Sequence, residues 1–175
     1  MTREHFLGTM DMKDYEFVIL GSGDERYATF FDDLMGRFPQ QVAFRSGHDD
    51  ALAHLIEAGS DMFLMPSRYE PCGLNQMYSL RYGTIPIVRK TGGLADSVQH
   101  FDPGTGEGTG CVFNDFDVPA VRWGVATALA WFADVKMWRR LMDNAMAQDF
   151  SWGRQTLKYE RVYRDALEFG GASRA

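Results

Sequence analysis

Short apolar runs alternate with amphipathic stretches along most of this chain, and this alternation constrains its fold more than any other feature. The runs that predict strands are residues 17–20, 42–45, 61–66, 85–88 and 111–113. The helical stretches that follow the first four runs are residues 24–37, 49–58, 73–81 and 94–99. Strands that alternate with helices form a parallel sheet with helices on both faces. We therefore predict an α/β fold with a doubly wound, Rossmann-like parallel sheet.

The third run and the C-terminal third of the chain add two expectations. Residues 61–66 are apolar throughout, which is typical of a strand buried on both faces. Helices are predicted near 117–133, 134–148 and 153–169, and together they form a helical C-terminal tail over about 117–170. No repeat or linker divides the chain, so residues 1–175 are predicted to form a single domain.

Composition excludes several classes of function. The net charge is −6, and no cluster of Lys and Arg offsets it, so we expect no nucleic-acid partner. No apolar run approaches the roughly 20 residues of a membrane span, so we expect no membrane partner. A domain of this size does not need a disulfide between Cys72 and Cys111, which favours an intracellular setting. His5, His54 and His100 are interpreted as structural or incidental residues, and we expect neither a metal site nor a cofactor.

Two glycine turns follow neighbouring strands of the predicted sheet, at the edge where such sheets bind ligands. After the third run comes Glu70, and the backbone N–H groups of Gly73, Leu74 and Asn75 then open a helix. Unpaired N–H groups at a helix N-terminus suit a phosphate or sugar hydroxyls. The turn over 89–94 places two cations and two glycines before another helix. Two converging glycine turns with a carboxylate between them suggest a nucleotide-sugar site.

The run over 58–98 contains S-R-Y-E-P-C-G-L-N-Q and R-K-T-G-G-L-A-D, and it strongly resembles bacterial glycogen synthase and plant starch synthase. These enzymes belong to glycosyltransferase family five and have the GT-B architecture of two facing Rossmann-like domains. The resemblance extends to V-I-L-G-S-G-D, L-A-H-L-I and D-F-S-W, so it covers nearly the whole chain. It implies an enzyme that transfers glucose from ADP-glucose to the non-reducing end of an α-1,4-glucan with retention of configuration.

The resemblance also implies roles for individual residues. Glu70 corresponds to the family glutamate near the transferred glucose, which is thought to orient the sugar and support oxocarbenium-like charge. The backbone of Cys72, Gly73, Leu74 and Asn75 corresponds to the segment that binds the sugar hydroxyls and distal phosphate. The remaining residues expected at the donor site are Tyr78, His48, Thr91, Gly92 and Gly93. Many related enzymes have a second glutamate at the position of Tyr78 and an aromatic residue that packs on adenine at His48.

The same resemblance predicts that this chain is an N-terminally truncated C-terminal domain. The first strand of the domain, the Arg and Lys that bind the diphosphate, and the whole N-terminal domain with the acceptor face would lie upstream of Met1. The usual strand order places that first strand centrally, between the second and the fourth. We expect the N-terminal residues or another chain to fill this position, or the sheet to rearrange, and self-association is one outcome. We also expect the chain alone to be inactive.

Two other functions are compatible with the sequence. One is a non-catalytic module that binds a nucleotide or a glucan. The other is a GT-B transferase for a UDP- or GDP-sugar, which Tyr78 and the E-P-C-G-L run disfavour. The expected location is the cytoplasm, or the plastid stroma if the protein is from a plant.

Overall fold

The structure, a computed structural model, describes residues 15–172 and contains every predicted element in the predicted order. The strands are β1 (Phe17–Gly21), β2 (Val42–Ser46), β3 (Met62–Met65), β4 (Ile85–Arg89) and β5 (Cys111–Phe113). The helices are α2 (Glu25–Arg37), α3 (Asp50–Gly59), α4 (Asn75–Tyr82), α5 (Gly92–Ser97), α6 (Val118–Phe132), α7 (Val135–Met146) and α8 (Trp152–Ala172).

Aspartates fix where four of the helices begin. Asp24 accepts a hydrogen bond from the Arg26 N–H and caps α2, and Asp49 accepts one from the Leu52 N–H and caps α3. Asp117 and Asp134 cap α6 and α7 in the same way. These carboxylates satisfy N–H groups that have no partner within the helix, and they stabilise the positive end of its dipole.

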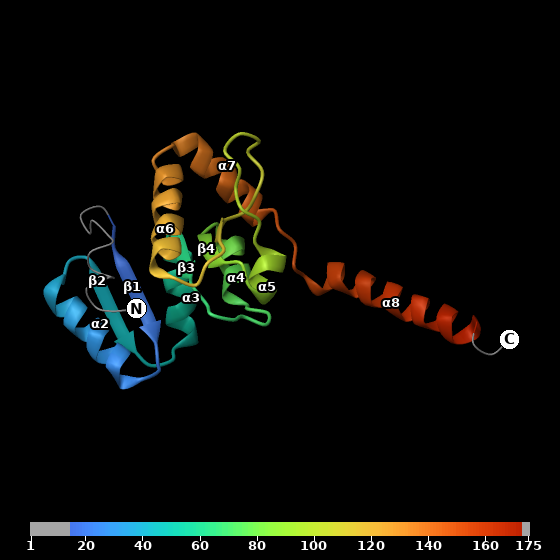
Figure 1. Cartoon of the computed structure of the whole chain (residues 1–175), viewed down its shortest axis with the longest axis horizontal. Helices are drawn as coiled ribbons and strands as arrows, with labels where there is room; N and C mark the ends of the chain where they lie inside the picture. The colour runs from blue at the N-terminus through green and yellow to red at the C-terminus, as the bar shows by residue number, and fades with distance from the viewer. Residues whose placement is uncertain (1–14, 173–175) are drawn as a thin grey trace.

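All strands are parallel, but they form two separate sheets. β1 pairs with β2, and β3 pairs with β4, which pairs with β5. β1 and β3 lie next to each other without pairing, so the strands follow the spatial order β2, β1, β3, β4, β5 (Figure 1). The open position between β1 and β3 is the one that the usual strand order gives to a first strand. The described residues do not rearrange into one continuous sheet. The expectation that the N-terminal residues fill the open position concerns residues 1–14, which lie outside the described range.

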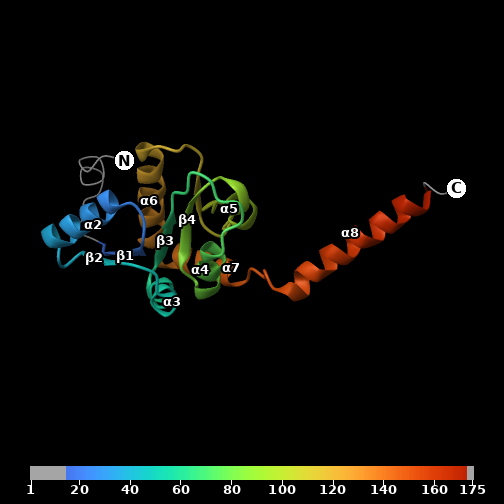
Figure 2. The same cartoon turned by 90° about the horizontal axis from the view of Figure 1, so that it is seen from below.

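Helices cover both faces of these sheets. α6 lies on one face and α3 on the other, with β1 and β3 between them (Figure 2). The larger core lies where α4, α6 and α7 pack on β3, β4 and β5, and it includes Leu80, Ile87, Phe101 and Leu141. A second, small cluster between α2 and the first sheet has Leu34 and Val42 as its buried members.

The expectation that the third strand is buried on both faces is wrong. All four residues of β3 are only half-buried, whereas Ile85 to Val88 of neighbouring β4 are fully buried. The physical reason is that β4 has a strand on each side, and β3 has one only on its β4 side.

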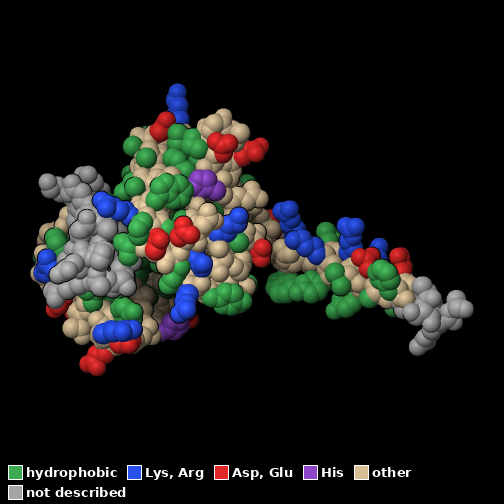
Figure 3. Space-filling view, in the orientation of Figure 1, with side chains coloured by type: hydrophobic (Ala, Val, Ile, Leu, Met, Phe, Trp, Pro, Cys, Tyr) green, Lys and Arg blue, Asp and Glu red, His purple; other side chains and the backbone are tan. Residues whose placement is uncertain are grey.

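The predicted helical tail divides into two parts. α6 and α7 pack against each other and against the second sheet, so they belong to the body of the domain. Only α8 extends away from it (Figure 1). Its apolar side chains lie along one side and its charged ones along the other, as Figure 3 shows. Within the described residues, no helix combines the length and apolar character that crossing a membrane requires.

Candidate functional site

The two glycine turns meet at the carboxyl ends of β3 and β4. The Gly93 N–H donates a hydrogen bond of 3.0 Å to the Glu70 carbonyl oxygen. A Cβ atom at Gly92 would overlap that same oxygen, and one at Gly93 would overlap the Cys72 carbonyl oxygen. Only glycine permits such a close approach of two backbones. The glycines of the second turn are therefore required by the contact with the first.

The buried side-chain amide of Gln76 stabilises the contact between the two turns. The Gln76 side chain is 1% exposed, and its Nε2 donates to the carbonyl oxygens of Cys72 at 3.0 Å and Gly73 at 3.1 Å. The same Nε2 lies 3.1 Å from Ser97 Oγ, which in turn donates to the Gly93 carbonyl at 2.6 Å. Sequence reasoning overlooked Gln76 and Ser97 because their positions, 21 residues apart, give no local sign of a shared network.

The two turns offer different numbers of free donors. α4 begins at Asn75, two residues later than predicted, because Gly73 has a φ of 72° that no helix accommodates. No hydrogen bond to another described residue is recorded for the N–H groups of Gly73, Leu74 and Asn75. At the second turn, Thr91 precedes α5, and the Gly93 N–H is already bonded to Glu70. The first turn therefore has three consecutive N–H groups without a partner among the described residues, whereas the Gly93 N–H of the second turn holds the two turns together.

A pocket of about 220 Å³ lies beside the first turn, at the carboxyl ends of β1 and β2. It brings together three residues expected from the sequence, His48, Asn75 and Tyr78, with the backbone of Gly21 and Gly47. His48 is exposed, and its Nε2 lies 3.0 Å from Asp50 Oδ1. The arrangement offers a polar, partly aromatic pocket next to the free N–H groups of α4.

The other predicted residues lie outside this pocket. Glu70 is half-buried in the loop before the first turn, and the thiol of Cys72 is exposed. The Arg89 guanidinium donates hydrogen bonds to the backbone carbonyl oxygens of Arg68 at 2.8 Å and Asn114 at 3.1 Å. Its role in the structure is to brace loops, which leaves Lys90 as the exposed cation of the second turn.

Two residues of α3 complete the pocket wall and were not predicted. The His54 ring lies 5.0 Å from the Tyr78 ring, and its Nδ1 is 3.2 Å from the Tyr82 hydroxyl. Glu57 is 4% exposed, and its Oε2 has no hydrogen-bond partner among the described residues. Burial raises the pKa of Glu57, and the nearby His54 opposes this rise. The sequence did contain a sign of this residue, because Glu57 follows Ile56 on the inward face of an otherwise apolar helix.

The thiol of Cys111 does not have the environment of a nucleophile. Burial raises the pKa of Cys111 to about 12, so it stays protonated at neutral pH. Within residues 15–172, no three His, Cys, Asp or Glu side chains are grouped so that they could bind a metal ion.

Comparison with known proteins gives consistent results. A family model described as glycosyl transferases group 1 matches residues 8–138. Glycogen synthase from Koribacter versatilis is 54% identical over 152 residues, which are 87% of this chain and 31% of that protein. The same enzyme from Pseudothermotoga lettingae is 48% identical over 165 residues, 94% of this chain and 34% of that protein. The chain thus spans about a third of the length of these curated relatives.

Solved structures agree. The catalytic domain of starch synthase IV from Arabidopsis thaliana, bound to ADP and acarbose, superposes with a TM-score of 0.81 and 36% identity, covering 95% of this chain and 35% of that one. Sucrose-phosphate synthase from Thermosynechococcus elongatus, at a TM-score of 0.62 and 20% identity, covers 95% of this chain and 42% of that one and shares the fold alone.

The parallel sheets, the helices on both faces and the interlocked turns at the carboxyl edge define a Rossmann-like domain of the GT-B glycosyltransferase class. The chain belongs to the group 1 glycosyl transferases, and its domain is of the glycogen and starch synthase type.

Proposed function

We propose that this chain binds the donor in a retaining transfer of glucose from ADP-glucose to the non-reducing end of an α-1,4-glucan. The observation that carries the proposal is the first glycine turn, where the free N–H groups of Gly73, Leu74 and Asn75 lie beside Glu70 and the pocket of His48 and Tyr78. The starch synthase that this chain resembles at 36% identity has ADP and acarbose bound. Both ligands belong to the chemical classes that the proposal requires.

In this proposal the protein backbone makes most of the contacts with ADP-glucose. The N–H groups at the start of α4 stabilise the charge of the distal phosphate and bind sugar hydroxyls, with the α4 dipole adding to the effect. Preorganised donors of this kind lower the barrier because they need no rearrangement as the diphosphate departs. Glu70 orients the glucose and supports its oxocarbenium-like charge. His48 and Tyr78 line the nucleotide side, and Thr91, Gly92 and Gly93 contribute donor contacts from the second turn, outside the pocket itself.

The proposal includes a second domain and an acceptor. Because the chain corresponds to about a third of its relatives' length, we propose that the acceptor face and further phosphate contacts come from the remaining two thirds. The 175-residue chain alone then elongates no glucan. The reaction needs no cofactor or metal in this scheme, and we place it in the cytoplasm or, in a plant, the plastid stroma.

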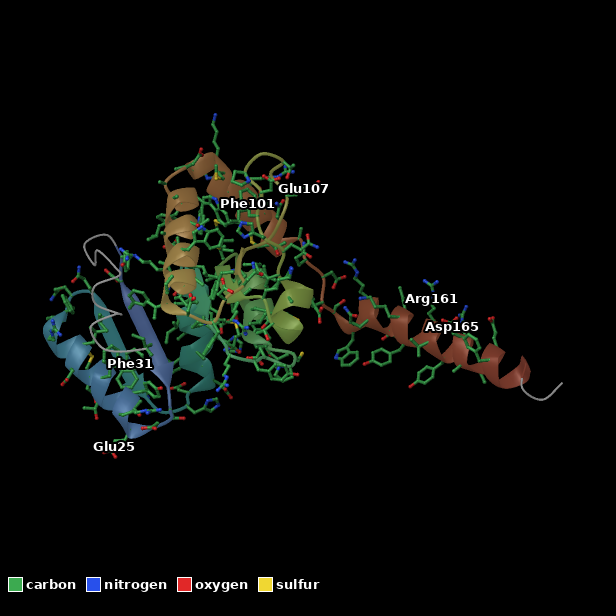
Figure 4. The ribbon with its side chains drawn as sticks, viewed as in Figure 1. Glu25, Phe31, Phe101, Glu107, Arg161 and Asp165 are labelled. Carbon is green, nitrogen blue, oxygen red and sulfur yellow. The ribbon has the colours of Figure 1, made fainter. Side chains whose placement is uncertain are left out.

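The decisive experiment replaces Glu70 in the protein expressed with the upstream part of its coding sequence. Glu70→Gln should lower kcat by about a hundredfold or more while ADP binding changes little, because the carboxylate acts on the sugar and not on the nucleotide. Glu107→Gln is the matched control, since Glu107 lies on an exposed loop at another edge of the molecule (Figure 4). Unchanged kcat in Glu70→Gln, or an upstream sequence that encodes no second domain, would contradict the proposal.

Donor choice needs a separate measurement. Competition between ADP-glucose and UDP-glucose in the same protein should favour the adenine nucleotide. Calorimetry of the 175-residue chain with ADP and with maltooligosaccharides tests the alternative of a stand-alone binding module. Tight binding of either by this chain alone would favour that alternative.

A further inference from the structure

The side-chain amide of Gln76 uses only one of its two ends. Its Nε2 donates to the Cys72 and Gly73 carbonyl oxygens and lies 3.1 Å from Ser97 Oγ. Its Oε1 is buried and has no hydrogen-bond partner among the described residues. A buried acceptor without a donor costs stability, and an apolar side chain of the same size would avoid that cost. The amide is therefore better explained by the groups that its donor end holds than by packing.

The two carbonyl groups that Gln76 holds fix the direction of two N–H groups. In a planar trans peptide the C=O and the N–H point in opposite directions. The Cys72 carbonyl shares its peptide with the Gly73 N–H, and the Gly73 carbonyl shares its peptide with the Leu74 N–H. Because both carbonyls point at the buried amide, both N–H groups point away from it, toward the outer side of the turn. Neither N–H has a hydrogen-bond partner among the described residues.

The backbone of Gly73 makes this arrangement possible. Its φ of 72° is left-handed, and Leu74 follows in the right-handed region with a φ of −116° and a ψ of −36°. Successive residues of opposite hand bring their N–H groups to one side and form a concavity that binds anions. A Cβ atom at Gly73 would also overlap Gln76 Oε1. Glycine is thus required both by the turn and by the amide that packs against it.

The third free N–H of the turn, that of Asn75, is oriented by a different part of the structure. It shares a peptide with the Leu74 carbonyl, which accepts hydrogen bonds from the Met77 N–H at 2.9 Å and the Tyr78 N–H at 3.0 Å. These bonds belong to the start of α4, so the helix itself fixes this peptide. The direction of two N–H groups of the turn therefore depends on Gln76, and the direction of the third does not.

Gln76 also connects these N–H groups to the second turn. Ser97 is on α5, which lies beside α4 (Figure 1), and its Oγ donates to the Gly93 carbonyl at 2.6 Å. The Gly93 N–H in turn donates to the Glu70 carbonyl at 3.0 Å. One set of hydrogen bonds thus holds both the backbone of Glu70 and the free N–H groups of the first turn.

We infer that Gln76 is a positioning residue, which aims the Gly73 and Leu74 N–H groups at the distal phosphate of the donor. It does so by holding the carbonyl groups of the same two peptides on the inner side of the turn. Ser97 keeps the amide in register with the second turn. The inference rests on the proposed donor-binding function and adds to it a buried residue that touches no ligand.

The test follows the amide signals of the turn by NMR while the 175-residue chain is titrated with pyrophosphate, which carries the diphosphate group alone. In the wild-type chain the signals of Gly73, Leu74 and Asn75 should all shift. In Gln76→Met, which keeps the side-chain length but has no donor, the Asn75 signal should still shift and the other two should not. Loss of two hydrogen bonds to a charged group should also weaken pyrophosphate binding by roughly tenfold or more.

Ser79→Ala is the matched control. Ser79 is fully buried on the same helix, and its Oγ also has no partner among the described residues, so it holds no carbonyl of the turn. This variant should leave all three shifts unchanged. Gln76→Glu is the second test variant, because an ionised glutamate has the size of glutamine and no donor. It should reproduce the pattern of Gln76→Met.

Three results would overturn the inference. One is wild-type shifts of Gly73 and Leu74 in both Gln76 variants. Another is equal loss of all three shifts in both variants, folded or not, which would mean that Gln76 supports the turn as a whole. The last is a wild-type chain in which pyrophosphate shifts none of the three signals.

ADP binding separates these results from failure of the proposed function. It is measured by calorimetry in the protein expressed with the upstream part of its coding sequence. Absence of ADP binding there contradicts the proposed function. Bound ADP together with any of the three results above contradicts the inference about Gln76 alone.

Discussion

The strands of the two sheets have similar composition, but β4 is buried much more completely than β1 or β3. β1 reads F-V-I-L-G and β3 reads M-F-L-M, and both are apolar, yet neither is fully buried. β4, with a strand on each side, is buried over its first four residues. The same contrast separates the cores, because Phe101 and its neighbours pack under α6 and α7 (Figure 4), whereas the β1–β2 sheet has little more than Leu34 and Val42. Burial here depends on neighbouring strands more than on side-chain type.

This comparison implies that the two halves differ in stability. Opening of a structure begins where few apolar groups are buried and backbone hydrogen bonds are exposed. The β1–β2 half, with α2, meets both conditions, since one edge of β1 is unpaired within the described residues. It is expected to open first, and the β3–β5 half to unfold with the body of the domain.

The largest expected effect comes from truncating the larger core. Leu80→Ala, at a fully buried position of α4, should lower the free energy of unfolding by about 2–5 kcal/mol. Leu34→Ala should cost less, because the other members of its small cluster are mostly only partly buried and can relax around the lost atoms. Urea denaturation should show this, because the β1–β2 half contains no tryptophan and the buried Trp131 and Trp138 make the fluorescence change report on the larger half. If Leu34→Ala shifts the fluorescence and circular dichroism transitions together, the two halves unfold as one and the comparison fails.

The next effect compares two glycines, one from each half. Gly93→Ala should destabilise the protein by about 1–3 kcal/mol, because its Cβ would overlap the Cys72 carbonyl. Gly36→Ala in α2 meets no atom within 4 Å and should stabilise by up to about 1 kcal/mol. Thermal unfolding of both variants measures the difference. Equal effects would mean that the contact between the two turns adds nothing to stability.

A smaller effect concerns pH and the boundary between the halves. Because burial raises the pKa of Glu57, the folded state binds more protons than the unfolded state between the ordinary glutamate pKa, about 4.3, and the raised value. Stability from this group is therefore fully present below that window and is lost as pH rises through it. Glu57→Gln should flatten this part of the pH profile and add about 1 kcal/mol at pH 7. Identical profiles for the two proteins would show that the carboxylate has a donor in solution.

The smallest effect is expected outside both halves. Removing α8 by a stop codon after Ser151 should change the free energy of unfolding of the body by no more than about 0.5 kcal/mol, since the apolar residues of α8 are exposed. They include Trp152, Leu157, Tyr163 and Phe169. Calorimetry with and without α8 checks this. A clear loss of stability would mean that α8 packs on the body in solution.

Local signals predicted most of the fold. Apolar runs identified all five strands, and Asp24 and Asp49 marked two helix starts by their capping chemistry. Gly92 and Gly93 misled the prediction of α5, which begins two residues earlier than expected, because glycine usually lies outside helices and here a backbone contact requires it. The half-burial of β3 follows from the open position that the described residues leave between β1 and β3, which the apolar pattern of residues 61–66 does not show by itself.

For the candidate site, the sequence predicted where the two turns lie but not the contacts that join them. Sequence reasoning placed both glycine turns at one edge of the sheet, because parallel strands align their carboxyl ends. It could not anticipate that the Gly93 N–H bonds to Glu70, or that Gln76 and Ser97 connect the turns, since these bonds span 20 or more residues. The roles of these residues in binding remain predictions.

The contact between the turns also affects which mutations the protein can accept. Its main hydrogen bond joins a backbone N–H to a backbone carbonyl, so no change of side chain at Glu70 removes either atom. Exposed neighbours such as Cys72 and Lys90 can therefore vary, and with them the chemistry presented to a ligand, while the scaffold stays in place. Gly92, Gly93 and the Gln76–Ser97 pair have no such freedom. Substitutions at these surface positions can thus change the chemistry that the edge exposes while the chain keeps its fold.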